Sequence, residues 1–283
     1  SRATGDLHRP DGTAVPPASE KRTAWRGGRP EPRASAARIG KERKKQRERC
    51  PRPGTRPWEA VKAAVMNGWR PVGVHGTSSH GVRLYIQMLE DAMKEANLSV
   101  EHIRGLCTTM EHNTVLGTPD DVMAKIKEYG IILNVNTPYL DWTSVLIKDY
   151  GEVLRPYAMP VKTWINEGIR VTFEATGTNF WKPIHTLITR EITNPLTQEK
   201  ETMLSEQAID RVTALKMTTT WASEYILAED TLGTLESGKY ADFAVLEKDF
   251  FTIPVEEILE MEVIMTGLSG EIVYDRDQLA AGM

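Results

Sequence analysis

The feature that most constrains the fold is a regular alternation of short apolar runs and helical patterns that begins at Trp58. The apolar runs lie at residues 71–75, 103–110, 131–135 and 169–173. The segments between them carry apolar residues three and four positions apart, which is typical of amphipathic helices, at 82–93, 120–130 and 161–168. Strands and helices that alternate at this spacing predict right-handed βαβ units and a parallel sheet. The expected fold class is therefore α/β.

The pattern changes after this alternation. A helix is predicted over residues 204–227, and a turn-rich segment follows at 233–242. Short strands are predicted at 243–246, 263–265 and 270–274. We therefore expect an α/β domain over residues 58–230 and a small β element over residues 231–283.

Residues 1–57 have a different composition from the rest of the chain. They contain 16 Lys and Arg against 6 Asp and Glu, and 8 of the 16 prolines. Few large apolar residues are present, so this segment is predicted to be a disordered basic arm. Residues 41–49 hold the densest charge, which would suit an acidic surface, but no aromatic residue is interleaved to stack on bases, and nucleic acid is not the expected partner. A mis-called start is the remaining alternative, because GC-rich DNA translated in the wrong frame gives such a composition.

Several classes of protein are disfavoured. No stretch approaches the ~20 apolar residues of a membrane helix, and the first ten residues lack the apolar core of a secretory signal. The two cysteines, Cys50 and Cys107, cannot form a disulfide framework, so a reduced cytoplasmic chain is expected. No glycine-rich nucleotide-binding motif and no G-x-S-x-G elbow is present.

Two histidines lie where chemistry is expected. In a parallel sheet, functional side chains follow the carboxyl ends of the strands, and His75 and His112 occupy that position on consecutive units. Neutral imidazoles from neighbouring strands suit a divalent transition metal, so both are candidate metal ligands. The alternative is that each is a hydrogen-bonded structural histidine. That structural role is the one expected for the histidines in helices or loops, at 80, 102 and 185.

A resemblance to a known family rests on the C-terminal segment. Residues 233–247, GTLESGKYADFAVLE, closely resemble the "GSLEPGKLADLVVLD" segment of metal-dependent amidohydrolases, in the branch called amidohydrolase family 3. Residues 214–224 resemble that family's "ALRMYTINAA" helix. His75 is similar to the histidine of the family's fifth barrel strand, and Glu111-His112 is similar to the "EH" that ends its sixth.

The resemblance implies a (β/α)8 barrel with one or two metals, usually zinc, and a β-sandwich built from both chain ends. It implies units five to eight of the barrel for this chain. Residues 58–230 number 173, against ~250 for a full barrel, and the family's strand-one "HxH" motif does not occur. We therefore expect a partial barrel with a small C-terminal β-sandwich element.

The eighth strand departs from the family's pattern. Thr176 stands where the family has an aspartate, and a threonine hydroxyl is a poor base and a weak zinc ligand. Glu174 lies two residues earlier on the same face, so its carboxylate could partly substitute; the alternative is that it hydrogen-bonds within the barrel. Glu174 and Thr176 are the candidate substrate-binding residues.

The resemblance implies metal-dependent hydrolysis of a non-peptide C–N bond, of amide or imide type, in a small molecule. The missing motif and Thr176 predict that the chain is truncated and weak or inactive alone, with a divalent metal, zinc by implication, at low occupancy. The competing hypothesis is a non-catalytic scaffold or partner subunit derived from such an enzyme. A second copy, or another chain that supplies the missing half, is the expected protein partner.

Overall fold

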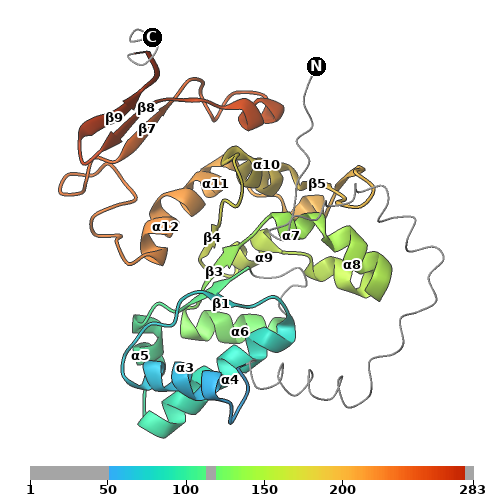
Figure 1. Cartoon of the computed structure of the whole chain (residues 1–283), viewed down its shortest axis with the longest axis vertical. Coiled ribbons are helices and arrows are strands. Elements are labelled where there is room, and N and C mark those ends of the chain that lie inside the picture. Colours follow the sequence, from blue (N-terminus) through green and yellow to red (C-terminus); the bar gives the residue numbers. More distant parts are fainter. Residues whose placement is uncertain (1–50, 113–118, 278–283) are drawn as a thin grey trace, which may run out of the picture. The chain divides into compact units, whose positions relative to one another are not determined.

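The computed structural model describes residues 51–112 and 119–277, so the predicted arm lies almost wholly outside the described residues. The described part contains the predicted parallel sheet (Figure 1). Its four strands are adjacent in chain order and all parallel, which confirms the α/β class. They are β1 (Val74–His75), β2 (Thr109–Glu111), β3 (Ile132–Val135) and β4 (Val171–Phe173).

Helices precede and connect these strands. They are α3 (Arg56–Met66), α4 (Ser79–Ala96), α5 (Val100–Gly105), α6 (Asp120–Tyr129), α7 (Pro138–Asp141), α8 (Thr143–Tyr150), the 3₁₀ segment η2 (Glu152–Tyr157) and α9 (Val161–Asn166). No helix of the described ranges has the length and apolar character needed to cross a bilayer.

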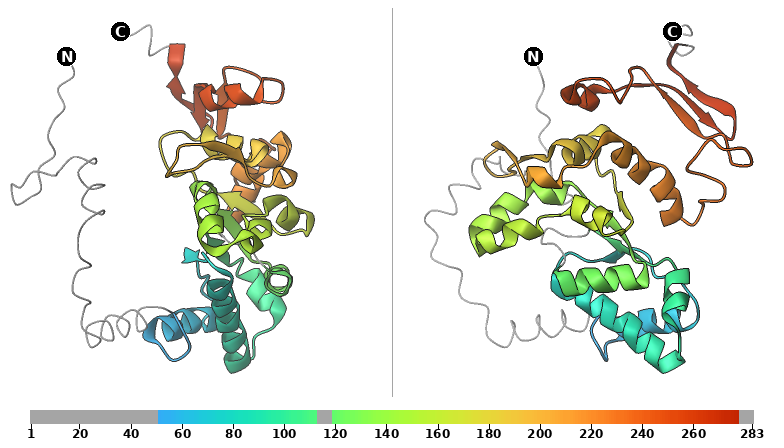
Figure 2. Two further views of the ribbon diagram at one scale, coloured as in Figure 1. Left: turned by 90° about the vertical axis from the view of Figure 1, so that its right-hand side faces the viewer. Right: turned by 180° about the vertical axis from the view of Figure 1, so that it is seen from behind.

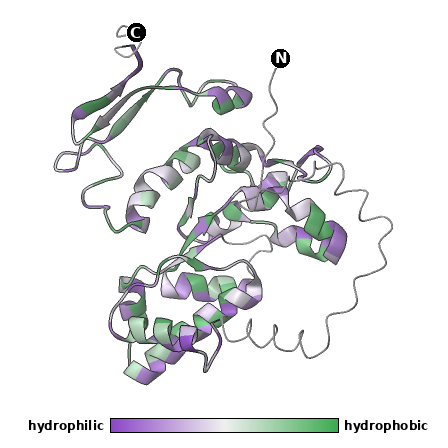
Figure 3. Cartoon of the chain, in the orientation of Figure 1, coloured by the Kyte–Doolittle hydropathy of each residue, from purple (hydrophilic) through white to green (hydrophobic). Residues whose placement is uncertain are grey.

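Helix α4 shows how the sequence sets its own boundaries. The Ser78 side chain accepts a hydrogen bond from the Gly81 N–H at 3.2 Å and so caps the first turn. Apolar side chains at Val82, Ile86 and Leu89 are buried along one side, and the helix therefore has a hydrophobic and a hydrophilic side (Figure 3). Asn97 ends the helix in the left-handed conformation, with φ of 52°.

Two of the predicted elements differ from those in the structure, because each predicted range is divided between shorter elements. Residues 103–110 do not form one strand, because Ser99 accepts the N–H of His102 and caps α5, and only the end of that run enters β2. Residues 204–227 do not form one helix either. The hydroxyls of Thr218 and Thr219 both donate to the Leu215 carbonyl, and Thr219 leaves helical geometry, with φ of −121° and ψ of −93°. These hydroxyls compete with helical hydrogen bonds, so the helix divides there.

The C-terminal third begins with helices and ends in a sheet. Its elements are α10 (Trp181–Thr189), β5 (Glu191–Thr193), β6 (Lys200–Thr202), η3 (Ser205–Gln207), α11 (Arg211–Thr218), α12 (Thr220–Tyr225), β7 (Phe243–Leu246), η4 (Val255–Glu260), β8 (Val263–Leu268) and β9 (Glu271–Asp275). Strands β7, β8 and β9 lie side by side as one antiparallel sheet (Figure 2). The predicted strands of the C-terminal β element are thus present, and a sandwich of two sheets remains a prediction.

One glycine of the C-terminal motif is required by its surroundings. Gly233 has a φ of 89°, and a Cβ there would collide with the side chain of Ser223 on α12. Any other residue would be strained in conformation and would displace the end of α12. The first glycine of the motif therefore sets how closely this turn approaches the helix.

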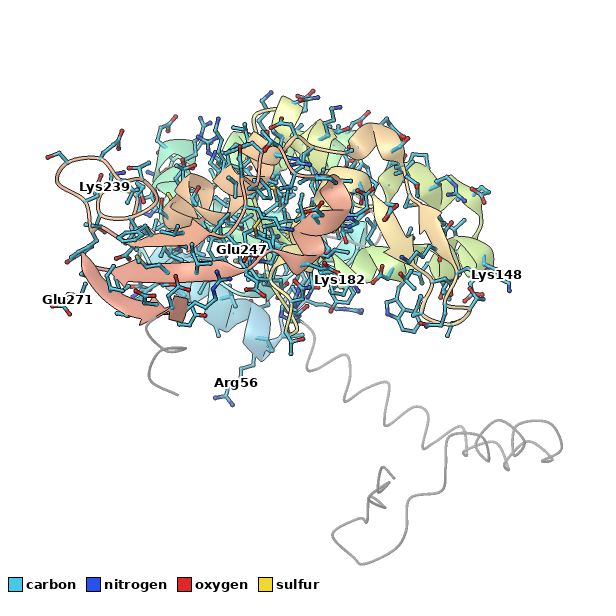
Figure 4. The ribbon with its side chains drawn as sticks, turned by 90° about the horizontal axis from the view of Figure 1, so that it is seen from above. Arg56, Lys148, Lys182, Lys239, Glu247 and Glu271 are labelled. Atoms are coloured by element: carbon cyan, nitrogen blue, oxygen red, sulfur yellow. The ribbon has the colours of Figure 1, made fainter. Side chains whose placement is uncertain are left out.

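The parallel sheet has two faces of opposite character. Paired residues of neighbouring strands point to the same side, and one side carries the row Val74, Met110, Leu133 and Val171. The last three of these are fully buried in the hydrophobic core. Charged side chains elsewhere, such as Arg56, Lys148 and Glu271, point away from the ribbon (Figure 4) and are exposed. The opposite face of the sheet is polar, and it carries the candidate site.

Candidate functional site

A row of polar side chains crosses the second face of the parallel sheet. The strand register pairs His75 with Glu111, Glu111 with Asn134, and Asn134 with Thr172. His75 is exposed, whereas Glu111, Asn134 and Thr172 are only 7%, 8% and 3% exposed. Buried polar groups are retained only where they are hydrogen-bonded or serve a function. This row therefore identifies the side of the sheet on which chemistry is expected.

The two predicted metal-ligand candidates meet at the carboxyl edge of the sheet. His75 ends β1 and His112 directly follows β2. Their imidazole rings are edge to face, with centroids 4.0 Å apart and planes at 73°. Tyr139 contacts the His112 ring at a centroid distance of 5.3 Å. His112 has a φ of 61°, in the left-handed region that few residues other than glycine adopt.

The two residues predicted from the last strand have separate partners. A carboxylate oxygen of Glu174, Oε1, contacts Nδ1 of His112. Thr176 is exposed, and its hydroxyl lies 3.3 Å from Oδ1 of Asn136, to which it donates. The structure thus brings Glu174 to the histidine pair and attaches Thr176 to the segment after β3.

The hydrogen-bond network around the Glu111 carboxylate was not predicted from the sequence. Asn134 Nδ2 donates to its carboxylate at 2.6 Å, Thr109 Oγ1 donates at 3.2 Å, and the Tyr225 hydroxyl donates to Oε1. Burial, together with the hydrogen bond to Glu111, raises the pKa of Tyr225. The available signal for Glu111 and Thr109 was their spacing of two residues on one strand face. Nothing local marks Tyr225, which lies 114 residues from its partner.

Arg70 holds the end of α12 near this network. Its Nε donates to the Cys107 carbonyl at 2.7 Å, and its second guanidinium nitrogen donates to the Tyr225 carbonyl. The guanidinium also lies 5.7 Å from the centroid of the Tyr225 ring. Arg70 therefore joins the segment before β1, the segment before β2 and the end of α12, and it directs the tyrosine toward Glu111.

A separate cleft lies away from the histidines. It has a volume of about 620 Å³ and lies between α10, α11, α12, β7 and the turn after α12. Its lining is mostly apolar, with Phe180, Leu215, Ile226 and Phe243 among the contributors. None of the four predicted site residues lines it. The histidine pair and this cleft are therefore distinct features of the described residues.

Comparison with known proteins identifies the family. Residues 56–274 match the family model Amidohydro_3, described as the amidohydrolase family. That range spans the parallel sheet and nearly all of the C-terminal sheet. The chain belongs to the amidohydrolase family. The resemblance carried by the residues after Gly233 is thereby confirmed. No curated protein matches the chain.

Solved structures of metal-dependent hydrolases have a similar fold. An uncharacterized metal-dependent hydrolase from Pyrococcus horikoshii has a TM-score of 0.55 and 16% identity, with 70% of this chain and 39% of that chain covered. The atrazine chlorohydrolase of Arthrobacter aurescens, complexed with zinc, has a TM-score of 0.50 and 17% identity, with 82% of this chain and 52% of that chain covered. The chain thus spans only 39% to 52% of the length of these two structures.

The donor set of this amidohydrolase chain fits part of a metal site. Two adjacent imidazoles are suitable ligands for a divalent transition metal. Within residues 51–112 and 119–277, no three His, Cys, Asp or Glu side chains gather around a common point. A catalytic zinc usually has three protein ligands. His75 and His112 therefore fit as two ligands and do not complete a site by themselves.

Proposed function

We propose that this chain is the metal-binding C-terminal portion of a hydrolase that cleaves a non-peptide C–N bond, of amide or imide type, in a small molecule. The convergence of His75 and His112 at the carboxyl edge of a parallel sheet, in a chain of this family, carries the proposal. Parallel strands in chain order support units five to eight of a (β/α)8 barrel over residues 58–230. Residues 231–283 would then belong to its β-sandwich.

His75 and His112 would bind the metal through ring nitrogens, and the remaining ligands would come from outside the described residues. A bound divalent metal, zinc in this proposal, supplies Lewis acidity toward a substrate carbonyl and lowers the pKa of water. The chain's own residues would orient the metal-binding histidines and enclose the substrate. Tyr139 packs on the His112 ring. Glu174 and Thr176 follow β4, and in this proposal they lie near the bound substrate, Glu174 beside His112.

A non-catalytic scaffold or partner subunit is the second candidate function, and Thr176 favours it. This side chain is exposed and hydrogen-bonded to Asn136, and its hydroxyl cannot accept a proton as readily as a carboxylate would. In this alternative, the sheet keeps the fold and the histidine pair while another chain, or a second copy, carries the reaction.

Zinc titration of the purified chain tests the first proposal. We expect micromolar or weaker binding that is lost in His112→Ala and in His75→Ala, because each variant leaves one imidazole. His80→Ala is the matched control, since His80 is exposed on α4, and it should bind zinc as the unaltered chain does. Zinc binding that persists in His112→Ala contradicts the proposed ligand pair.

Hydrolysis assays with small amides and cyclic imides separate the two functions. We expect no measurable turnover by the chain alone, because two imidazoles leave the metal's ligand set incomplete. Turnover that appears on addition of a chain carrying the missing barrel units, and disappears with His112→Ala, supports the hydrolase. Turnover in that mixture that is unaffected by His112→Ala supports the scaffold.

A further inference from the structure

The two ring nitrogens of His112 have different surroundings. An imidazole has two nitrogens, and the atom that binds a metal is set by the hydrogen bond that the other one makes. In His112, Nδ1 contacts the Glu174 carboxylate. The ring is also confined by His75 on one side, at 4.0 Å, and by Tyr139, at 5.3 Å, between ring centroids. These contacts leave Nε2 as the ring nitrogen without a hydrogen-bond partner in the described part of the chain.

Glu174 is held in place by the sheet. Its backbone N–H donates to the Val135 carbonyl at 2.9 Å, which continues the ladder between β3 and β4. Its side chain is 25% exposed and that of His112 is 14% exposed, so the contact is shielded from bulk water on most sides. Among the described residues, the Glu174 carboxylate has its side-chain hydrogen-bond contact with His112. The carboxylate is therefore directed at the imidazole by backbone geometry.

We infer that Glu174 is a positioning residue that accepts a hydrogen bond from Nδ1–H of His112 and thereby fixes Nε2 as the metal-binding atom. This inference rests on the proposed function, in which His112 binds a metal. It gives Glu174 a role that differs from a third metal ligand or a substrate contact. A carboxylate on the far nitrogen fixes the tautomer, restricts ring rotation and raises the basicity of the ligating nitrogen. Thr176 hydrogen-bonds to Asn136 and does not belong to the Glu174–His112 pair.

The tautomer of His112 in the metal-free full chain tests this role directly. Nitrogen-15 NMR at about pH 8.5, well above the ordinary histidine pKa of about 6.5, reports which ring nitrogen carries the proton. We expect the Nδ1–H form in the unaltered chain and in Glu174→Gln, whose amide oxygen still accepts. In Glu174→Ala we expect a shift toward the Nε2–H form. Glu167→Ala, an exposed carboxylate at the end of α9, is the matched control and should leave the signals unchanged.

Zinc affinity provides the second readout. Loss of a carboxylate that orients a metal-bound histidine typically weakens binding 10–100-fold, so we expect that loss in Glu174→Ala and a smaller one in Glu174→Gln. If Glu174→Ala does not fold, the tautomer of the unaltered chain and of Glu174→Gln still decides. An Nε2–H tautomer in the unaltered chain overturns the inference, as does an Nδ1–H signal that persists in Glu174→Ala. Absence of zinc binding in the unaltered chain refutes the proposed function. The tautomer is measured without metal, so it tests the role of Glu174 independently of that outcome.

Discussion

Arg190 offers the sharpest test of how this fold is held together. Its side chain is 0% exposed, and its guanidinium donates to the carbonyls of Met203 at 2.9 Å, Met159 at 3.2 Å and Ala158 at 2.9 Å. Burial lowers the pKa of this guanidinium to about 10. A single side chain thus joins the end of α10 to the segment before α9 and to the end of the β5–β6 hairpin.

The magnitude follows from two opposing terms. Hydrogen bonds from a charged donor contribute about 1.5–3 kcal/mol each, so three contribute roughly 4.5–9 kcal/mol. The lowered pKa of Arg190, to about 10, corresponds to a burial cost of roughly 3 kcal/mol at about 1.4 kcal/mol for each pH unit. Arg190→Met removes both the hydrogen bonds and the burial cost of the charge, and the net loss in the free energy of unfolding is about 3 kcal/mol. For a chain of this size that lowers the Tm by roughly 6–12 °C.

Urea unfolding followed by tryptophan fluorescence measures this loss. Arg83→Met is the control, because the Arg83 side chain is 47% exposed where it pairs with Asp121 at 2.9 Å. Exposed ion pairs contribute about 0.2–1 kcal/mol, so this variant should change stability little. A loss below about 1 kcal/mol in Arg190→Met would refute the reasoning, since the three carbonyls would then not depend on the guanidinium.

Three further predictions concern pH, the polar face and the last strand. Burial lowers the pKa of His185 below its ordinary value, so the stability that its neutral form contributes above about pH 6.5 should be lost as the pH falls. In His185→Phe, the urea midpoint should therefore depend less on pH between about pH 7.5 and 5. Tyr225→Phe should destabilise the chain by about 1.5 kcal/mol and raise amide exchange in α12 roughly tenfold, because the Glu111 carboxylate loses a buried donor, whereas the exposed Tyr150→Phe should do neither. Thr176→Asp should tighten zinc binding in calorimetry without turnover by the chain alone, since one carboxylate does not complete the ligand set; turnover in that variant would contradict the partial site.

The parts of the fold that the sequence predicted are those that depend on local patterns. The apolar run 131–135 and the helix closed by Gly130 follow from side chains within a few positions of one another, and both are present. The strand predicted over 103–110 was wrong for a local reason as well. Ile103 is buried, as a strand residue would be, but the Ser99 cap starts a helix there, and an apolar run alone does not distinguish the two.

The candidate site was predictable only in part, and sequence separation explains the division. His75 and His112 could be proposed because the carboxyl ends of parallel strands share one edge of the sheet. The partner of each side chain at that edge could not be proposed. Glu174 lies 62 residues from His112, and its choice between ligand, substrate contact and hydrogen-bond acceptor depends on where β4 lies relative to β2. That register is a property of the assembled sheet.

The polar face gives a physical reason for the position of α12. Glu111 would be a buried carboxylate without enough donors if only Thr109 and Asn134 reached it, and an under-paired buried charge is costly. The Tyr225 hydroxyl supplies the additional donor. The break of the helix at Thr219 lets α12 take a direction independent of α11, so that its last residue can reach this face. The adjacent threonines at the break, whose hydroxyls at Thr218 and Thr219 donate to the Leu215 carbonyl, therefore allow the Tyr225 hydroxyl to reach the Glu111 carboxylate on the sheet.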